Sequence, residues 1–78
     1  MRSKVTASKD LTLALAKTLS ETAAKHHSEI RLLYRDKVAN AKSLMGVVAL
    51  SYKKGAELYL VAEGKDAARA TDAVKALL

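Results

Sequence analysis

Two segments of the chain alternate in side-chain character with a period of two, and this periodicity limits the fold more than any other feature. Residues 28–34 place Ile30, Leu32 and Tyr34 on one side of an extended backbone. Residues 56–61 repeat the pattern with an alanine and two leucines. Alternation of this kind is typical of a strand with one buried face, so the sequence predicts a sheet covered on one side only.

Three further segments have the composition and the boundary residues of helices. Residues 13–25 are rich in Ala, Leu, Lys and Glu, and Thr12 stands before them as a hydroxyl N-cap. Ser43 is placed to cap a short helix that runs to about residue 48 or 50. Asp66 is predicted to be the N-cap of the last helix, because it lies two residues after Gly64 and precedes an alanine-rich run.

The order of these segments predicts an α+β domain. Residues 2–7 read as a first strand, and residues 37–40 return from residues 28–34 through a turn at Arg35 and Asp36. The resulting order β-α-β-β-α-β-α is a split βαβ plan with an added helix, whose helices cover one face of an antiparallel sheet. With 78 residues we expect one domain over 1–78, and periodicity alone leaves its strand order open.

Composition excludes several classes of function. Fourteen Lys and Arg oppose eight Asp and Glu, but the basic residues are spread along the chain and only Lys53 and Lys54 are adjacent. We therefore expect solvated surface charge, and the distribution argues against a dedicated nucleic-acid patch. The chain has no Cys, which excludes disulfides, thiol catalysis and Cys-ligated metals, and we expect no metal or cofactor. Its longest uncharged stretch, residues 43–52, is too short to span a bilayer, so we expect a cytoplasmic protein without membrane attachment.

A particular motif then points to a family. Residues 40–47 read Asn-Ala-Lys-Ser-Leu-Met-Gly-Val, which resembles the regulatory-serine region of HPr, the phosphocarrier protein of the bacterial sugar phosphotransferase system. Residues 54–57 and 62–67 look like the fourth strand and the last turn of the same family. The resemblance implies an HPr-like open-faced sandwich, with a four-stranded antiparallel sheet of order 1-4-2-3 and three helices on one face.

The chain departs from that family at the start of the first helix. Family members have His, Ala, Arg and Pro there, and the His carries a phosphoryl group, whereas this chain has Thr12, Leu13, Ala14 and Leu15. The resemblance thus implies a variant that is neither an enzyme nor a His phosphocarrier, similar to the catabolite-repression members of the family. His26 and its neighbour lie more than three helical turns further on, roughly 20 Å away, so neither is placed to replace the missing His.

Around Ser43 the sequence matches the family's regulatory-serine motif. By resemblance, Ser43 is phosphorylated by HPr kinase/phosphorylase, and a phosphate there would meet free amides at a helix start; the alternative that Ser43 is only a structural cap stays open. The residues expected to contact protein partners form an apolar patch with one added cation, namely Leu11, Leu13, Leu15, Lys42, Leu44, Met45 and Val47.

Three functions remain open at this point. The first is a regulatory interaction protein switched at Ser43, whose partners are HPr kinase/phosphorylase or a transcriptional regulator. The second is a binding module that uses the apolar patch and the positive field, without phosphorylation, to recognise an acidic protein or nucleic acid. The third is a phosphocarrier that acts through another residue. We expect a monomer or a weak homodimer in each case.

Overall fold

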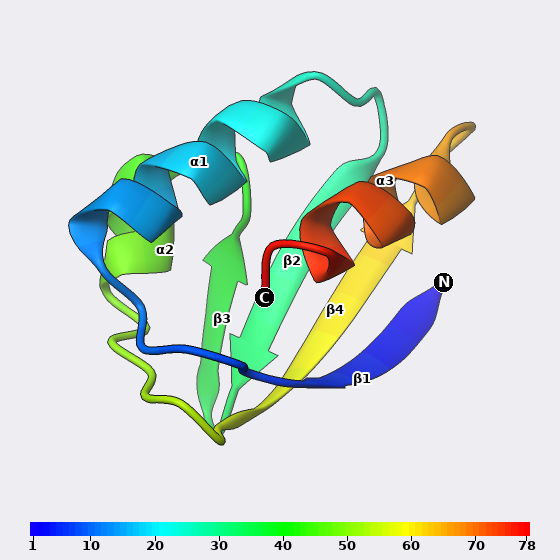
Figure 1. Cartoon of the computed structure of the whole chain (residues 1–78). Helices are drawn as coiled ribbons and strands as arrows, with labels where there is room; N and C mark the ends of the chain where they lie inside the picture. The colour runs from blue at the N-terminus through cyan, green and yellow to red at the C-terminus, as the bar shows by residue number, and fades with distance from the viewer.

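Strand β4 (Glu57–Glu63) is an inner strand of a sheet that also contains β1 (Arg2–Thr6), β2 (Glu29–Tyr34) and β3 (Lys37–Asn40), and it has hydrogen-bonded neighbours on both sides. In the computed structural model, which describes all 78 residues, the sheet has the order β1-β4-β2-β3 and every neighbouring pair is antiparallel (Figure 1). The strand order and the helix placement expected from the family resemblance are confirmed. The elements in chain order are β1 (Arg2–Thr6), α1 (Leu13–Ala24), β2 (Glu29–Tyr34), β3 (Lys37–Asn40), α2 (Leu44–Val48), β4 (Glu57–Glu63) and α3 (Ala67–Lys75).

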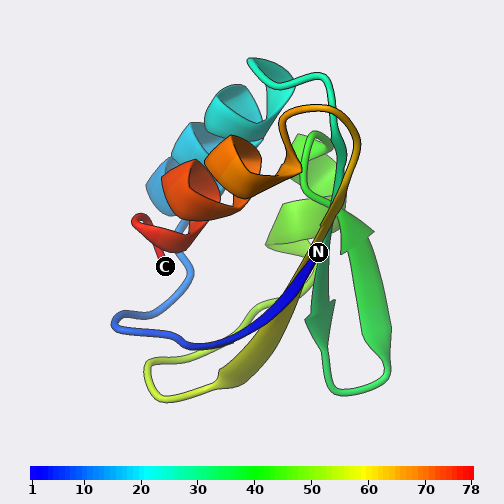
Figure 2. The ribbon, with the colours of Figure 1, turned by 90° about the vertical axis from the view of Figure 1, so that its right-hand side faces the viewer.

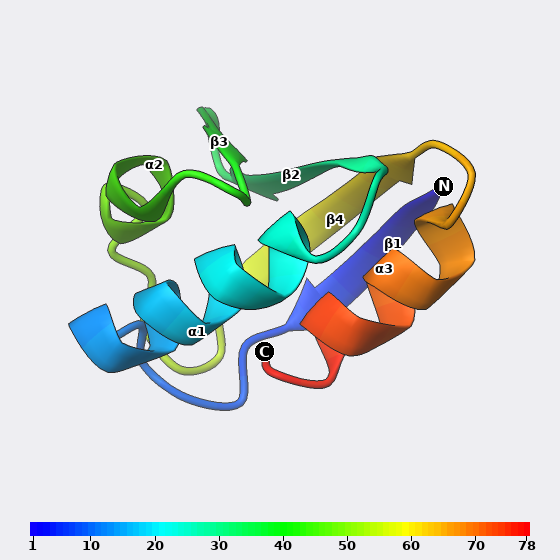
Figure 3. The same cartoon turned by 90° about the horizontal axis from the view of Figure 1, so that it is seen from above.

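The molecule has two layers, with the helices on one face of the sheet and solvent on the other. Figure 2 shows the layers from the side, and Figure 3 shows α1 and α3 next to each other across the sheet while α2 lies toward the β3 edge. No helix in the chain has both the length and the apolar character needed to cross a bilayer.

The core forms where the alternating strands meet the helices. Ile30 and Leu32 of β2, and Leu58, Leu60 and Ala62 of β4, are almost completely buried. Their neighbours in the strands point to the opposite face of the sheet, because successive side chains of a strand alternate. The helices contribute three alanines to this core together with Leu19, Val47 and Val74.

Asp66 links the start of α3 to the segment that leads into β2. It occupies the N-cap position of α3 as the sequence predicts, but its side chain makes no capping hydrogen bond. Its carboxylate instead accepts hydrogen bonds from the backbone N–H groups of His27 (3.1 Å) and Ser28 (2.9 Å) and from the Ser28 hydroxyl. The tertiary contact displaces the cap because it offers three donors to the carboxylate. These hydrogen bonds, led by that of the Ser28 hydroxyl, hold the pKa of Asp66 well below its usual range.

Gly64 makes this link sterically possible. Its φ of +145° lies in a region that side-chain-bearing residues rarely adopt. A Cβ atom at Gly64 would lie 2.8 Å from the Cα atom of Ser28, which is closer than real Cβ contacts. The turn between β4 and α3 therefore requires glycine for two independent reasons.

We predict that Gly64→Ala lowers the free energy of unfolding by about 2–4 kcal/mol, because it adds a backbone clash to an unfavourable φ. Gly55→Ala is the matched control. Gly55 also has a positive φ (91°), but its Cβ would meet no atom within 4 Å, so we expect a loss of only about 1–2 kcal/mol. Urea denaturation followed by circular dichroism measures both, and equal losses would contradict the clash.

We also predict a pH-dependent stability that Asp66 controls. Because the folded-state pKa of Asp66 is lowered, its carboxylate stabilises the fold above the unfolded pKa of about 3.9, and this stabilisation is lost as the pH falls through the folded value. Asp66→Asn should lower the melting temperature at pH 7 and flatten its decrease toward pH 2. Asp72→Asn, at an exposed position on the same helix, is the control and should leave the slope unchanged.

Candidate functional site

Thr12 immediately precedes α1, and its hydroxyl caps the helix. Its backbone is extended (φ −111°, ψ 166°), and its Oγ1 accepts a hydrogen bond from the N–H of Leu15 at 3.1 Å. This geometry satisfies one of the amides that the first turn of a helix leaves without a partner. No imidazole or carboxylate is hydrogen-bonded to the Thr12 hydroxyl, so nothing in the structure activates it as a nucleophile.

Backbone pairing beyond the end of the sheet determines where Thr12 lies. Ala7 donates to Ala56 O (2.9 Å) and accepts from Gly55 N (2.8 Å), so the β1–β4 ladder continues past Thr6. The N–H of Leu11 then bonds to the carbonyl of Tyr52 at 3.0 Å. These bonds bring the start of α1 beside the loop that follows α2, about forty residues later in the chain.

Ser43 is the N-cap of α2, as Thr12 is of α1. Its Oγ accepts a hydrogen bond from Gly46 N at 3.2 Å, and its own N–H donates to Asn40 O at 2.9 Å. The side chain is half-buried. A Cβ at Gly46 would come within 3.3 Å of this Oγ, so the glycine of the motif leaves room around the hydroxyl. The structure thus places Ser43 at the predicted N-cap.

The ammonium group of Lys42, next to Ser43 in the sequence, is hydrogen-bonded within the protein. Its Nζ donates a hydrogen bond of 2.8 Å to the carbonyl of His26, which follows the end of α1. The Nδ1 atom of His26 lies 3.1 Å from Thr22 O, and His27 is exposed. Lys42 therefore joins α1 to the start of α2, and the two histidines lie at the far end of α1 from Thr12.

The apolar residues expected to contact partners differ in how far their side chains are exposed to solvent. Leu13 (68%), Met45 (77%) and Leu44 (37%) are exposed, whereas Leu11 and Leu15 are half-buried and packed against the core.

Val47, by contrast, is completely buried and cannot contact a partner, so its assignment to the partner surface is wrong. The helical repeat explains the difference, because Val47 lies two positions from Met45 and points to the opposite side of α2.

A shallow hollow of about 230 Å³ lies at the start of α1. It is lined by Leu11, Thr12, Leu13, Val48, Ser51 and Lys53. The sequence did not single out Val48, Ser51 and Lys53, although Val48 lies three positions after Met45 and so shares its side of α2. We call Leu13, Leu44 and Met45, together with the residues of this hollow, the α1–α2 surface.

The chemistry available at the α1–α2 surface is that of binding. Its lining offers apolar side chains, two hydroxyls and the ammonium group of Lys53, with no carboxylate among them. No group of three or more His, Cys, Asp or Glu side chains in the chain is arranged to hold a metal ion. The surface fits an apolar partner that carries negative charge at its rim.

The family model for the PTS HPr component phosphorylation site matches residues 2–78. Among solved structures, phosphocarrier protein HPr from Bacillus anthracis is 28% identical, with a TM-score of 0.94 and coverage of 100% of this chain and 95% of that chain. An HPr dimer from Thermoanaerobacter tengcongensis is 36% identical, with a TM-score of 0.79 over 86% of this chain and 77% of that one.

A third similar structure is Crh, the catabolite repression protein of Bacillus subtilis. It is 30% identical, with a TM-score of 0.80, and the match covers 90% of this chain and 80% of that chain. That protein was crystallised as an intertwined dimer with a swapped domain. The similar structures therefore include both a phosphocarrier protein and a catabolite repression protein.

Proposed function

The chain belongs to the HPr family of the phosphotransferase system, and we propose that it is a regulatory or interaction protein of that family, not a His phosphocarrier. The observation that carries the proposal is the first turn of α1. There Thr12 serves as a cap, and the next positions that the family uses for phosphoryl transfer hold Ala14 and Leu15.

The chemistry of phosphoryl transfer supports this reading of Thr12. A carrier needs a nucleophile that is active near neutral pH and a phosphorylated form labile enough to pass its group on, which an imidazole provides. A threonine hydroxyl without a general base is a poor nucleophile, and its phosphate ester is too stable to transfer. Ala14 also lacks the guanidinium that would hold a phosphate with two hydrogen bonds.

We propose that Ser43 is the regulatory phosphorylation site. The motif of residues 40–47 surrounds it, and its hydroxyl is half-buried at the start of α2 beside the exposed side chains of Leu44 and Met45. A phosphate on Ser43 would place about two negative charges next to this apolar surface and so change which partners it accepts.

The α1–α2 surface is the proposed partner-binding site, and HPr kinase/phosphorylase or a transcriptional regulator is the proposed partner. Its exposed residues, Leu13 and Met45, are large apolar side chains of the kind that carry binding energy at protein interfaces. We further propose that residues 1–78 act in the cytoplasm as one HPr-like domain, as a monomer or a weak homodimer.

A second candidate is a binding module that needs no phosphorylation. The observation in its favour is Lys53, which borders the apolar hollow without any carboxylate in the lining. Such a surface would attract an acidic protein directly, and substitution of Ser43 would then leave its binding unchanged.

We predict that HPr kinase/phosphorylase with ATP adds one phosphoryl group to the protein and none to Ser43→Ala, as measured by intact-mass spectrometry. Ser43→Thr is the matched control, because it keeps a hydroxyl and the cap, and a residual signal in this variant supports the site. An authentic HPr treated in parallel verifies the kinase. An unmodified protein beside a modified HPr would contradict regulation at Ser43 and favour the second candidate.

We also predict that the protein takes no acid-labile phosphoryl group from phosphoenolpyruvate and enzyme I, whereas the double variant Thr12→His, Ala14→Arg does. The imidazole restores the nucleophile and the guanidinium restores the phosphate contact. The pair Thr12→Ala, Ala14→Arg is the control and should stay unlabelled. An acid-labile label on the unaltered protein would show a carrier that uses another residue.

A further inference from the structure

The largest hollow in the molecule, with a volume of about 510 Å³, lies where open-face residues of the sheet meet the turn between β2 and β3. Strands β2 and β4 are paired from Glu29 and Glu63 to Leu33 and Tyr59, and the two strands are not paired beyond that point. The hollow lies there. It is lined by Arg2, Leu33, Tyr34, Arg35, Gly55, Ala56, Glu57 and Tyr59, none of which belongs to the α1–α2 surface.

Two arginines line this hollow, and each is held against an aromatic ring. The guanidinium carbon of Arg2 lies 4.4 Å from the centre of the Tyr59 ring, and that of Arg35 lies 5.1 Å from the centre of the Tyr34 ring. A guanidinium that stacks on a ring loses side-chain freedom while its N–H groups, which point outward in the guanidinium plane, stay available. Both arginines are therefore partly ordered before any ligand binds.

Neither arginine has a carboxylate partner. The ion pairs of the structure join Lys4 to Glu57 (3.1 Å) and Arg31 to two other glutamates, and they do not include Arg2 or Arg35. Glu57 is the one carboxylate that lines the hollow, and the ammonium of Lys4 already faces it. The hollow is consequently lined by two guanidinium groups that have no ion-pair partner.

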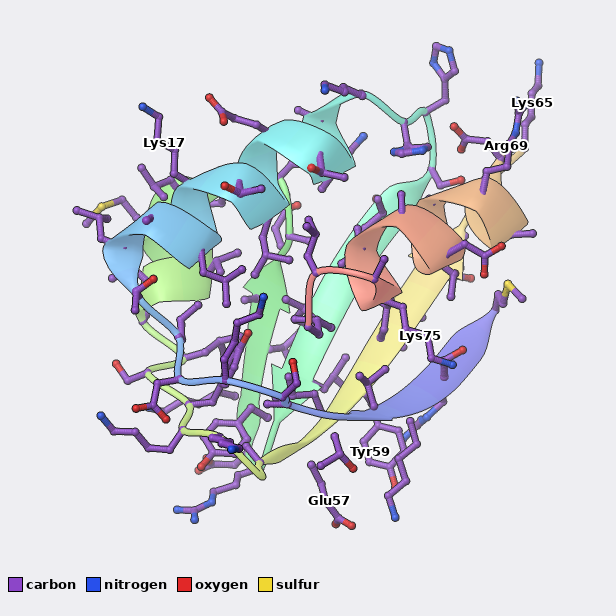
Figure 4. All side chains as sticks on the ribbon, viewed as in Figure 1. Lys17, Glu57, Tyr59, Lys65, Arg69 and Lys75 are labelled. Atoms are coloured by element: carbon purple, nitrogen blue, oxygen red, sulfur yellow. The ribbon has the colours of Figure 1, made fainter.

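The remaining lining suits the organic part of a ligand. Leu33, Ala56 and Tyr59 are half-buried and present carbon atoms to the hollow, and Gly55 adds no side chain that would obstruct it. A volume near 510 Å³ is within the range of sites for small molecules and is much larger than a bare phosphate ion requires. Figure 4 shows Glu57 and Tyr59 below β1 and β4, away from the labelled basic side chains of the helices.

We propose that this hollow binds a small organic phosphate, of sugar-phosphate or nucleotide size, whose phosphate lies between Arg2 and Arg35. Guanidinium groups bind phosphate oxygens through paired hydrogen bonds, and the apolar lining contacts the attached sugar or base. A long nucleic acid does not fit the same face. Beyond the hollow it would meet Glu29 and Glu63, which are opposite each other on β2 and β4, and the single cation Arg31 that pairs with both leaves an excess of negative charge there.

The test is a titration of the isotope-labelled protein with ADP and with glucose 6-phosphate, followed by two-dimensional NMR of the backbone amides. We expect saturable shifts confined to the lining, led by Leu33, Ala56 and Tyr59. Shifts with ADP alone would identify a nucleotide, and shifts with glucose 6-phosphate alone would identify a sugar phosphate; either result supports the site. The absence of saturable shifts with both compounds would overturn it.

Substitutions separate this site from a general attraction of anions to a basic protein. Arg2→Gln and Arg35→Gln should each weaken binding about tenfold, the loss expected for one charge-assisted contact. Arg31→Gln removes the same charge from the same sheet face outside the hollow and should leave the affinity unchanged. All three side chains are exposed, so the fold should persist, and circular dichroism verifies it. An equal loss in all three variants would overturn the proposal.

Discussion

The central position of β4 is the constraint on which the rest of the molecule depends. This strand pairs with β1 on one side and β2 on the other, although β1 precedes it by some fifty residues in the chain. Leu58, Leu60 and Ala62 lie under the helices, and the alternate residues of the strand, from Glu57 to Glu63, form the open face. Because the β1–β4 pairing continues to Ala7, it also delivers the start of α1 to the loop after α2. Both the α1–α2 surface and the hollow near the β2–β3 turn follow from this one strand.

Thr12 and Ser43 have the same structural role as N-caps but different roles in the proposed function. Thr12 and Ser43 each accept a hydrogen bond from a backbone amide three residues later, and both begin helices with apolar residues in the first turn. Neither hydroxyl has a general base. A carrier must take the phosphoryl group from a donor with its own nucleophile and release it again, whereas a regulatory site requires only access for an external kinase. This difference underlies the proposed function. Ser43 lies within the family's regulatory motif, whereas the residues after Thr12 are not those that the family uses for phosphoryl transfer.

Much of this architecture was predictable because local patterns determine it. The alternating segments became β2 and β4, the turn at Arg35 and Asp36 joined β2 to β3, and Thr12 and Ser43 became N-caps. The contacts that the sequence did not indicate join a side chain to a distant segment of the chain. The carboxylate of Asp66 binds the backbone near Ser28, not its own helix, and Lys42 bonds to His26. Such contacts leave no periodic signal in the sequence.

The sequence by itself determined the elements, their order, the residue types at the two caps and the membership of a family, because each depends on neighbouring residues or on a short motif. The tertiary structure decided which of these residues meet. It buried Val47, left Leu13 and Met45 exposed, and brought Arg2 from the first strand to the same hollow as Arg35 from the β2–β3 turn. The physical reason is that burial and charge pairing are set by packing between segments far apart in the chain, which only the folded sheet brings together.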